Sequence, residues 1–231
     1  MENSLLTPLQ KRVLVAFFDN GMGSRKFFFT GGTALAEFYL KHRYSDDLDF
    51  FTRKIGLLED DIATFRQTLS SLNLVISQET MTTEFVRLSV NEEGSKDKLK
   101  IEFARDRAGQ AMMEEPQVLK GIFVVDSFLD IAVNKVCTIL SRGPDEPKDF
   151  VDLYFILTSS NYSLNYLVSR AREKEAAFDS EDGVLQFAAR LRGVKNPLIM
   201  PRMIKPLSHE ELSSFLVPLA EQLIRSLAPK Q

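Results

Sequence analysis

The pattern of apolar positions in the first half of the chain alternates between short runs and helical periods. The apolar runs at 26–30 and 48–52 are bounded by Gly or polar residues, which is typical of buried strands. Between them, Leu35, Phe38 and Tyr39 recur at helical spacing, so we predict a helix that opens at the Gly pair after the first run. The other helices that helical periods predict in this half cover 8–20 and 58–72.

Three further runs show the alternation of β-strands. In 84–90 and 98–106 every second residue is apolar, and 72–79 is a third run that precedes them by a short turn. Neighbouring strands joined by short turns favour antiparallel pairing, so we predict a three-stranded meander. In the last of these strands, Lys100 and Glu102 lie on the face opposite to the apolar residues.

The pattern changes near residue 125, where helical periods replace the strand runs. Asp126 is predicted as the N-cap of the first helix, and Ser208 with Glu211 forms a capping box before a last helix of roughly 20 residues. Three prolines make 196–207 an extended connector. The helices that we predict before this connector cover 126–140, 148–157, 162–174 and 180–192.

The predicted fold class is therefore α+β, in two parts. Residues 1–125 are expected to form a mixed-sheet α/β domain, and residues 126–231 a helical domain. A length of 231 residues fits one large domain or two small ones.

Composition and charge narrow the classes of protein that this chain can be. With 44% apolar and 26% charged residues, collagen-like, disordered and disulfide-stapled proteins are excluded. A net charge of −3 gives no sign of a basic nucleic-acid module. No apolar run approaches the roughly 20 residues that span a bilayer, and the first residues lack the features of a secretory signal. Together with the single cysteine, Cys137, this predicts a cytoplasmic protein without a membrane partner.

Two features with chemical potential lie close together in the first half. Gly31, Gly32 and Thr33 stand between a predicted strand and a helix N-terminus, where bare backbone can approach an anion. Asp47 and Asp49 are two apart in the next strand, so their carboxylates share a face. A divalent cation offsets the repulsion of such a pair, and Mg²⁺ prefers carboxylates together with phosphate oxygens and water. A phosphate cradle beside a Mg²⁺ site is what phosphoryl or nucleotidyl transfer needs.

A family resemblance rests on three separated motifs: GGTALAEFYLKHRYSDDLDFF from residue 31, KIEF from residue 100 and KVCTILSRGPDEPKDFVDLYF from residue 135. These motifs resemble the AbiEii/AbiGii-type nucleotidyltransferases of the polymerase-β-like nucleotidyltransferase superfamily, many of which are toxins of toxin–antitoxin or abortive-infection systems. The resemblance covers roughly residues 25–160. It implies a nucleotidyltransferase fold for the N-terminal domain and Mg²⁺ as cofactor.

The resemblance also implies roles for individual residues. Asp47 and Asp49 would be metal ligands, with Glu102 as the candidate third carboxylate. A surface Glu102 paired with Lys100 is the structural alternative. The residues that the resemblance places on the nucleotide are Gly31, Gly32, Thr33, Arg43, Ser45, Lys135 and Lys148.

In the third motif, the resemblance makes Asp149 the catalytic acid/base and Asp152 the runner-up. Asp149 also fits a purely structural role, because an acid in the first turn of a helix complements the dipole. We expect the helices at 126–140 and 148–157 to bring Lys135 and Asp149 to the two aspartates of the D-x-D motif across a cleft.

The predicted function is Mg²⁺-dependent transfer of a nucleoside monophosphate from an NTP to an acceptor. The acceptor could be an RNA 3′ end such as that of tRNA, a protein hydroxyl or a small molecule, and a toxin would have a cognate antitoxin as partner. Two alternatives stay open. D-x-D also occurs in haloacid-dehalogenase phosphatases and glycosyltransferases, although Phe51 stands where the phosphatase motif has Thr or Val. The other alternative is a non-catalytic nucleotide- or partner-binding module on the same fold.

Overall fold

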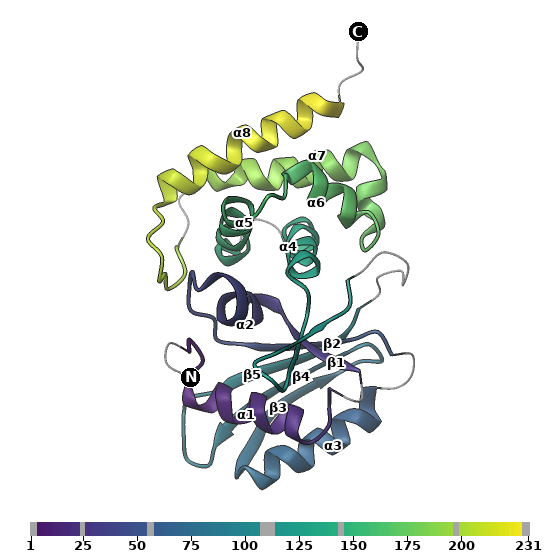
Figure 1. The fold of residues 1–231 in the computed structure, drawn as a ribbon, viewed down its shortest axis with the longest axis vertical. Helices are drawn as coiled ribbons and strands as arrows, with labels where there is room; N and C mark the ends of the chain where they lie inside the picture. The colour runs from purple at the N-terminus through teal and green to yellow at the C-terminus, as the bar shows by residue number, and fades with distance from the viewer. Residues whose placement is uncertain are drawn as a thin grey trace. The chain divides into compact units, whose positions relative to one another are not determined.

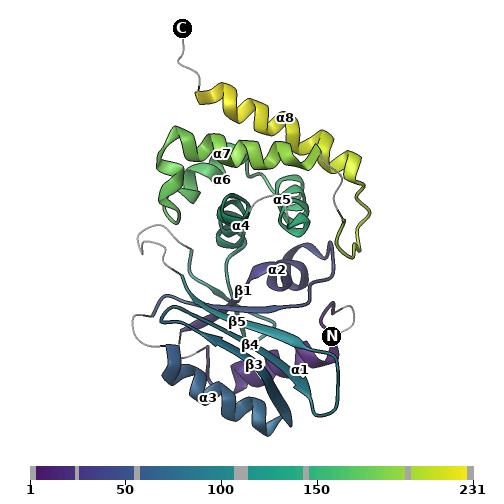
Figure 2. The ribbon, with the colours of Figure 1, turned by 180° about the vertical axis from the view of Figure 1, so that it is seen from behind.

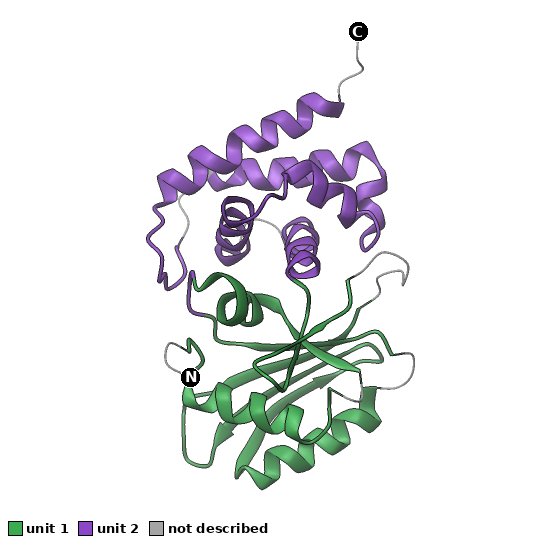
Figure 3. Cartoon of the chain, in the orientation of Figure 1, with its two compact units in different colours: residues 1–41, 45–107, 114–127 green, residues 42–44, 108–113, 128–231 purple. Residues whose placement is uncertain are grey.

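The chain divides into two compact units in the computed structural model, and each unit is described here by itself. The first unit comprises residues 1–41, 45–107 and 114–127, and the second comprises 42–44, 108–113 and 128–231 (Figure 3). The structure describes residues 4–23, 26–54, 58–106, 114–142, 146–195 and 199–227.

The first unit is built on a seven-stranded mixed sheet in the order β3-β4-β5-β2-β1-β7-β6. Parallel pairing joins β2 to β5 and β1 to β7, and the other neighbours are antiparallel. The predicted meander is confirmed as β3-β4-β5, while β6 and β7 are three-residue strands that the sequence pattern did not indicate. The strands are β1 (Phe27–Thr30), β2 (Leu48–Thr52), β3 (Leu74–Met81), β4 (Phe85–Glu92), β5 (Leu99–Arg105), β6 (Gln117–Leu119) and β7 (Phe123–Val125).

Helices cover both faces of this sheet. Figures 1 and 2 show α1 (Pro8–Asp19) and α3 (Leu58–Ser71) on one face and α2 (Gly31–Ala34) on the other. A π-helix, Leu35–Leu40, continues directly from α2. The predicted helix after the Gly pair is therefore confirmed, and its second part is a π-helix.

Phenylalanine rings fill the space between the sheet and α1. Phe17 of α1 stacks on Phe50 of β2 with ring centroids 3.9 Å apart, and Phe50 stacks on Phe103 of β5 at 5.5 Å. All three rings are fully buried. Because side chains alternate along a strand, this packing turns the neighbours of Phe50 and Phe103 toward the α2 face of the sheet.

The second unit is helical, as predicted. Met203, in the extended segment before the last helix, forms a β-bridge with Arg43. This bridge joins residues 42–44 to the second unit. The capping box before the last helix is confirmed by reciprocal hydrogen bonds between Ser208 and Glu211. The helices are α4 (Phe128–Arg142), α5 (Pro147–Ser159), α6 (Leu164–Ala171), the 3₁₀ turn Ala176–Asp179, α7 (Glu181–Arg192), the 3₁₀ turn Gly193–Lys195 and α8 (His209–Leu227).

The start of α4 differs from the prediction. The expected N-cap at Asp126 is wrong, because α4 begins at Phe128, and the Asp126 carboxylate instead accepts a hydrogen bond from the Thr30 hydroxyl (2.7 Å). Over the part of the chain that the structure describes, no helix has both the length and the apolar character to cross a bilayer.

Candidate active site

A pair of acidic residues lies at the start of β2, on the sheet face that carries α2. Because Phe50 is buried on the opposite face, strand alternation directs Asp47 and Asp49 toward α2. Asp49 is in register with Thr30 of β1 on one side and with Glu102 of β5 on the other. Glu102 therefore stands beside Asp49 on the adjacent strand.

The turn between β1 and α2 has no room for a side chain at residue 31. Gly31 has φ +74°, and a Cβ added there would lie 2.1 Å from Oδ2 of Asp49 and 2.9 Å from its Cβ. Thr33 donates its hydroxyl hydrogen to the main-chain oxygen of Asp47. Gly31 and Thr33 thus contact the acidic segment directly, while a phosphate contact by Gly31, Gly32 or Thr33 stays a prediction.

Two basic side chains stand among these carboxylates. The Lys100 ammonium lies 2.7 Å from Oδ2 of Asp47 and 3.4 Å from Oε1 of Glu102. Arg87 of β4 is in register with Glu102 and donates from Nε to the same Oε1 atom (2.7 Å). The structural alternative for Glu102, a pair with Lys100, is therefore present, and Lys100 approaches Asp47 more closely still.

These contacts keep Glu102 and Lys100 ionised. Burial would lower the pKa of Lys100, but the hydrogen bond and charge of Asp47, together with the charges of Glu102 and Asp49, outweigh burial and raise that pKa. Burial would raise the pKa of Glu102, but Lys100 and Arg87 outweigh it and lower that pKa. At neutral pH the cluster therefore contains a carboxylate at Glu102 and an ammonium at Lys100.

The donor set around Asp47 and Asp49 fits a magnesium ion in part. The two carboxylates share a face, and the Lys100 ammonium already occupies a cation position against Asp47. Mg²⁺ is commonly held by one or two carboxylates plus substrate phosphates, so two ligands suffice. Within the described residues, no three His, Cys, Asp or Glu side chains are grouped closely enough to hold a metal ion. Arg87 and Lys100 hold Glu102, and its role as third ligand stays a prediction.

A second polar cluster lies inside the helical unit, centred on Asp152 of α5. Arg43 binds both oxygens of this carboxylate, from Nε at 2.6 Å and from Nη2 at 2.7 Å. Lys135 of α4 lies 2.7 Å from Oδ2, and Nε2 of His42 lies 2.7 Å from Oδ1. Since an ionised carboxylate only accepts, His42 carries its proton on Nε2. All of these side chains are at least nine-tenths buried.

Asp152 is held in its ionised form. Burial would raise the pKa of Asp152, but the charges of Arg43 and Lys135, with the hydrogen bonds from His42 and Arg43, outweigh burial and hold that pKa well below its ordinary value. Burial is the largest influence on His42 and lowers its pKa, so the imidazole is neutral. A carboxylate with three basic partners and a depressed pKa accepts a proton poorly, which suits Asp152 to an anchoring role.

Asp149, one turn earlier on α5, differs from Asp152 in its partners. Its Oδ1 atom lies 2.7 Å from the Lys135 ammonium, whereas Oδ2 is buried and makes no hydrogen bond to any described residue. An unsatisfied buried oxygen is costly unless another group comes to it. Of the two acids, Asp149 therefore has the spare acceptor that a base requires.

Three other residues predicted to bind the nucleotide, Arg43, Ser45 and Lys148, make contacts with other parts of the protein. Arg43 is buried and donates from Nη1 to the main-chain oxygen of Tyr44, besides binding Asp152. The main-chain oxygen of Ser45 accepts from the Gln10 side chain (2.9 Å). Lys148 lies at the start of α5, 3.3 Å from the carboxylate of Glu146, and makes no contact with Asp149 that the structure records. The approach of Lys135 and Asp149 to Asp49 stays a prediction.

Lys100 and Arg87 were not among the predicted site residues. The signal for Lys100 was available, since it stands two positions before Glu102 and so shares its face. Arg87 also lies on the polar side of its strand, but only the register of β4 against β5 brings it to Glu102.

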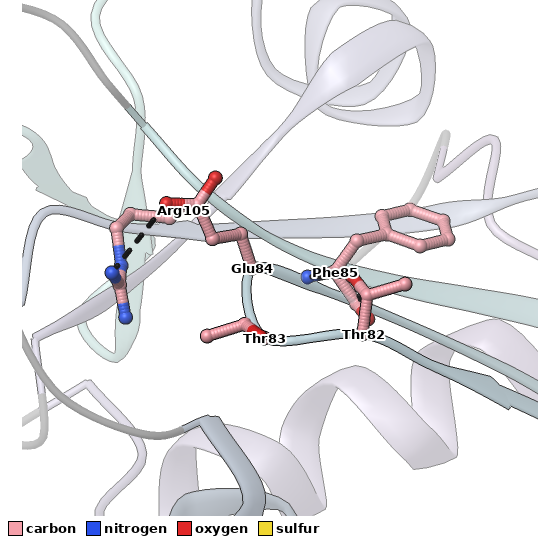
Figure 4. A pocket seen from close by; sticks show the side chains of 5 residues that line it. All are labelled: Thr82, Thr83, Glu84, Phe85 and Arg105. Atoms are coloured by element: carbon pink, nitrogen blue, oxygen red, sulfur yellow. Dashed lines mark hydrogen bonds and ion pairs between the residues drawn. The ribbon is translucent and has the colours of Figure 1, made fainter.

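A surface hollow of about 410 Å³ lies in the first unit at the hairpin between β3 and β4. Figure 4 shows its lining residues, with Arg105 directed toward Glu84 at 3.7 Å. Alternation along β5 puts Arg105 on the opposite sheet face from Glu102, so the hollow has no part in the site. The lining residues are Thr82, Thr83, Glu84, Phe85 and Arg105.

Comparison with known proteins identifies the class. The chain matches, over residues 12–225, the family described as nucleotidyl transferase AbiEii toxin, type IV toxin–antitoxin system. The chain belongs to this family and is a nucleotidyltransferase. It is also 32% identical over 157 residues to an uncharacterized protein of Aquifex aeolicus (strain VF5), across 66% of this chain and 68% of that protein.

Solved structures share the fold at low sequence identity. A candidate nucleotidyltransferase from H. pylori has a TM-score of 0.60 at 19% identity, covering 96% of this chain and 97% of that one. The protein JHP933 from Helicobacter pylori has a TM-score of 0.55 at 20% identity, covering 94% and 91%. These similarities confirm the predicted fold class.

The close approach of Gly31 to Asp49 predicts a specific effect of one added methyl group. In Gly31→Ala, the Cβ would displace the whole Asp49 side chain, so nucleotide transfer should be lost. Gly94→Ala is the matched control, because Gly94 has φ +77° and no described atom lies within 4 Å of an added Cβ. Each variant should lose about 1–2 kcal/mol of unfolding free energy to the left-handed backbone. Transfer at the wild-type rate in Gly31→Ala would show that the position of Asp49 is unimportant.

The anchoring role of Asp152 predicts a pH-dependent stability difference. In Asp152→Asn, Arg43 and Lys135 keep buried charges without their partner, which should cost about 3–5 kcal/mol at neutral pH. Because the folded pKa is depressed, the unfolded chain binds the proton first, at an ordinary pKa of about 3.9. Stability from Asp152 is thus present above that value and is lost as pH falls through the folded pKa.

The measurement is urea unfolding of wild type and Asp152→Asn from pH 7 downward, with the exposed Asp182→Asn as control. The difference between wild type and Asp152→Asn should narrow below about pH 4. A small difference at pH 7, or one that widens in acid, would contradict the anchoring role.

Proposed function

We propose that the protein transfers a nucleoside monophosphate from an NTP to a hydroxyl-bearing acceptor in a Mg²⁺-dependent reaction. The observation that supports this most directly is the Asp47–Asp49 pair, in which Asp49 packs against Gly31 at the turn where α2 begins and the main-chain oxygen of Asp47 accepts from Thr33. A bound Mg²⁺ would neutralise phosphate charge and orient the triphosphate for in-line displacement. The reaction joins the acceptor oxygen to the α-phosphorus and releases pyrophosphate.

The residues of the first unit would bind and position the nucleotide. Asp47 and Asp49 would hold the ion, with Glu102 as the third candidate. The backbone of Gly31 and Gly32 would lie against phosphate oxygens, since main-chain N–H groups at a helix start favour anions.

The residues of the second unit would serve the acceptor and the leaving group. We assign Asp149 as the base, because its Oδ2 can accept the acceptor's hydroxyl proton while Lys135 holds Oδ1. Lys135 and Lys148 would balance triphosphate charge as point charges. Asp152, with Arg43 and His42, would fix the position of Lys135 instead of taking part in proton transfer.

The family supports a biological role for this activity. Its members are described as toxins of type IV toxin–antitoxin systems, so we propose that this protein is a toxin with a cognate antitoxin. The acceptor belongs to one of three chemical classes: an RNA 3′ end such as that of tRNA, a protein hydroxyl, or a small molecule. Labelled NTPs offered to total RNA and to a protein extract would distinguish these classes by where the label appears.

The metal-binding assignment predicts that Asp47→Ala and Asp49→Ala each abolish Mg²⁺-dependent label transfer. Removing either anion weakens the ion and leaves phosphate charge unbalanced. Asp46→Ala, an exposed neighbour, carries the same charge change and should transfer at close to the wild-type rate. All three variants should keep the wild-type melting temperature within a few degrees. Wild-type transfer by Asp47→Ala or Asp49→Ala at limiting Mg²⁺ would refute the assignment.

The base assignment predicts a different phenotype for Asp149→Asn. General base catalysis contributes about 10²–10⁴-fold, so kcat should fall by at least about a hundredfold. Nucleotide affinity, measured by the shift in melting temperature on adding NTP, should persist, because the base acts on the acceptor. If Asp149→Asn transfers normally with saturating acceptor, the base lies elsewhere and Asp152 is the next residue to test.

A further inference from the structure

Lys100 stands where a cation is needed, yet the reaction proposed above gives it no role. Its ammonium lies 2.7 Å from Asp47 and 3.4 Å from Glu102. Its strand, β5, pairs with β2, which contains Asp49 and begins directly after Asp47. Its side chain is 36% exposed, so the ammonium is at the surface of the cluster and has room to move away.

Glu102 has two basic partners, Arg87 and Lys100, whereas the basic partner that the structure records for Asp47 is Lys100. Arg87 donates to Glu102 at 2.7 Å, which leaves Glu102 paired even if Lys100 withdraws. The ion pair that the structure records for Asp47 is the one with Lys100. Departure of the ammonium would thus expose Asp47 in particular, the residue whose main-chain oxygen Thr33 already holds in place.

We propose that Lys100 is a placeholder cation, whose ammonium neutralises Asp47 in the metal-free protein and must leave Asp47 before a divalent ion can bind there. This inference rests on the proposed function, because it takes Asp47 as a metal ligand. Lys100 is a positioning residue: it sets the affinity of the site for the metal and does not touch the reacting atoms.

The physical consequence is competition between two cations for one carboxylate. Three carboxylates and two basic side chains give the cluster a formal charge of −1 from Asp47, Asp49, Glu102, Arg87 and Lys100. A divalent ion that enters alone must displace an ammonium and then experiences its repulsion at short range. A metal that arrives with a triphosphate brings negative charge for the displaced ammonium. The site should therefore bind free metal weakly.

The test measures binding of Mn²⁺ alone, by electron paramagnetic resonance, without nucleotide or acceptor. Lys100→Met removes the competing charge and keeps an unbranched side chain that is one atom shorter. Its affinity for Mn²⁺ should be about tenfold tighter than that of wild type, and Mn²⁺ should raise its melting temperature more. Lys100→Arg keeps the charge and should bind Mn²⁺ close to wild type.

Lys96→Met is the matched control for net charge. Lys96 is exposed in the turn before β5 and makes the same change in total charge, so its Mn²⁺ affinity should stay close to wild type. Melting without metal shows that each variant is folded. Unchanged or weaker Mn²⁺ binding by Lys100→Met, or equal tightening by Lys96→Met, would overturn the placeholder role.

A double variant separates failure of this inference from failure of the proposed function. In Asp47→Asn with Lys100→Met, the tightening should disappear, because the carboxylate that the ammonium covered is gone. If Asp47→Asn weakens Mn²⁺ binding but Lys100→Met has no effect, the placeholder role alone is wrong. If Asp47→Asn leaves Mn²⁺ binding untouched, the ion binds elsewhere, and the metal site of the proposed function is wrong as well.

Discussion

The close approach between Gly31 and the Asp49 carboxylate is the constraint on which the rest of the site depends. It requires a residue without a Cβ at a left-handed position, where β1 turns into α2. It also keeps Asp49 on the α2 face of the sheet. The packing of Phe50 against Phe17 on the opposite face has the same effect, because neighbouring residues of a strand point to opposite faces. In β2, Phe50 thus faces the core, and Asp49 faces the candidate site on the other side of the sheet.

The two polar clusters differ in how completely their charges are satisfied. In the first unit, Lys100 and Arg87 balance only part of the negative charge of the carboxylates at Asp47, Asp49 and Glu102, and the Lys100 side chain is partly exposed. In the second unit, Asp152 is buried and bound by three basic residues, so its charges are a fixed part of the fold. Asp149 stands between these extremes, with one oxygen on Lys135 and the other unsatisfied.

The sequence predicted the elements of the fold because their patterns are local. The Phe-rich strands, the helix after the Gly pair and the meander follow from periodicity, and the shared face of Asp47 and Asp49 follows from their spacing. The three-residue strands β6 and β7 are too short to show a period. The parallel pairing of β2 with β5 brings Glu102 to Asp49 through a register that joins residues 53 positions apart, and the family motif pointed to Glu102 where periodicity alone could not.

Tertiary contacts also distinguish residues that look alike in the sequence. Asp149 and Asp152 look alike in the motif, and only the positions of Arg43 and His42 show which acid is saturated. Asp126 has the composition of a helix cap, yet it accepts from Thr30 because β1 and β7 pair in parallel beside it. In each case a partner distant in the chain determined the role.

The most direct test of the account is the crystal structure of the protein with Mn²⁺ and a non-hydrolysable NTP, with the ion located by its anomalous signal. The account predicts an ion at ligand distance, about 2.1 Å for a magnesium-type site, from oxygens of both Asp47 and Asp49, with the Lys100 ammonium withdrawn from Asp47. An ion bound without Asp47 and Asp49 would contradict it.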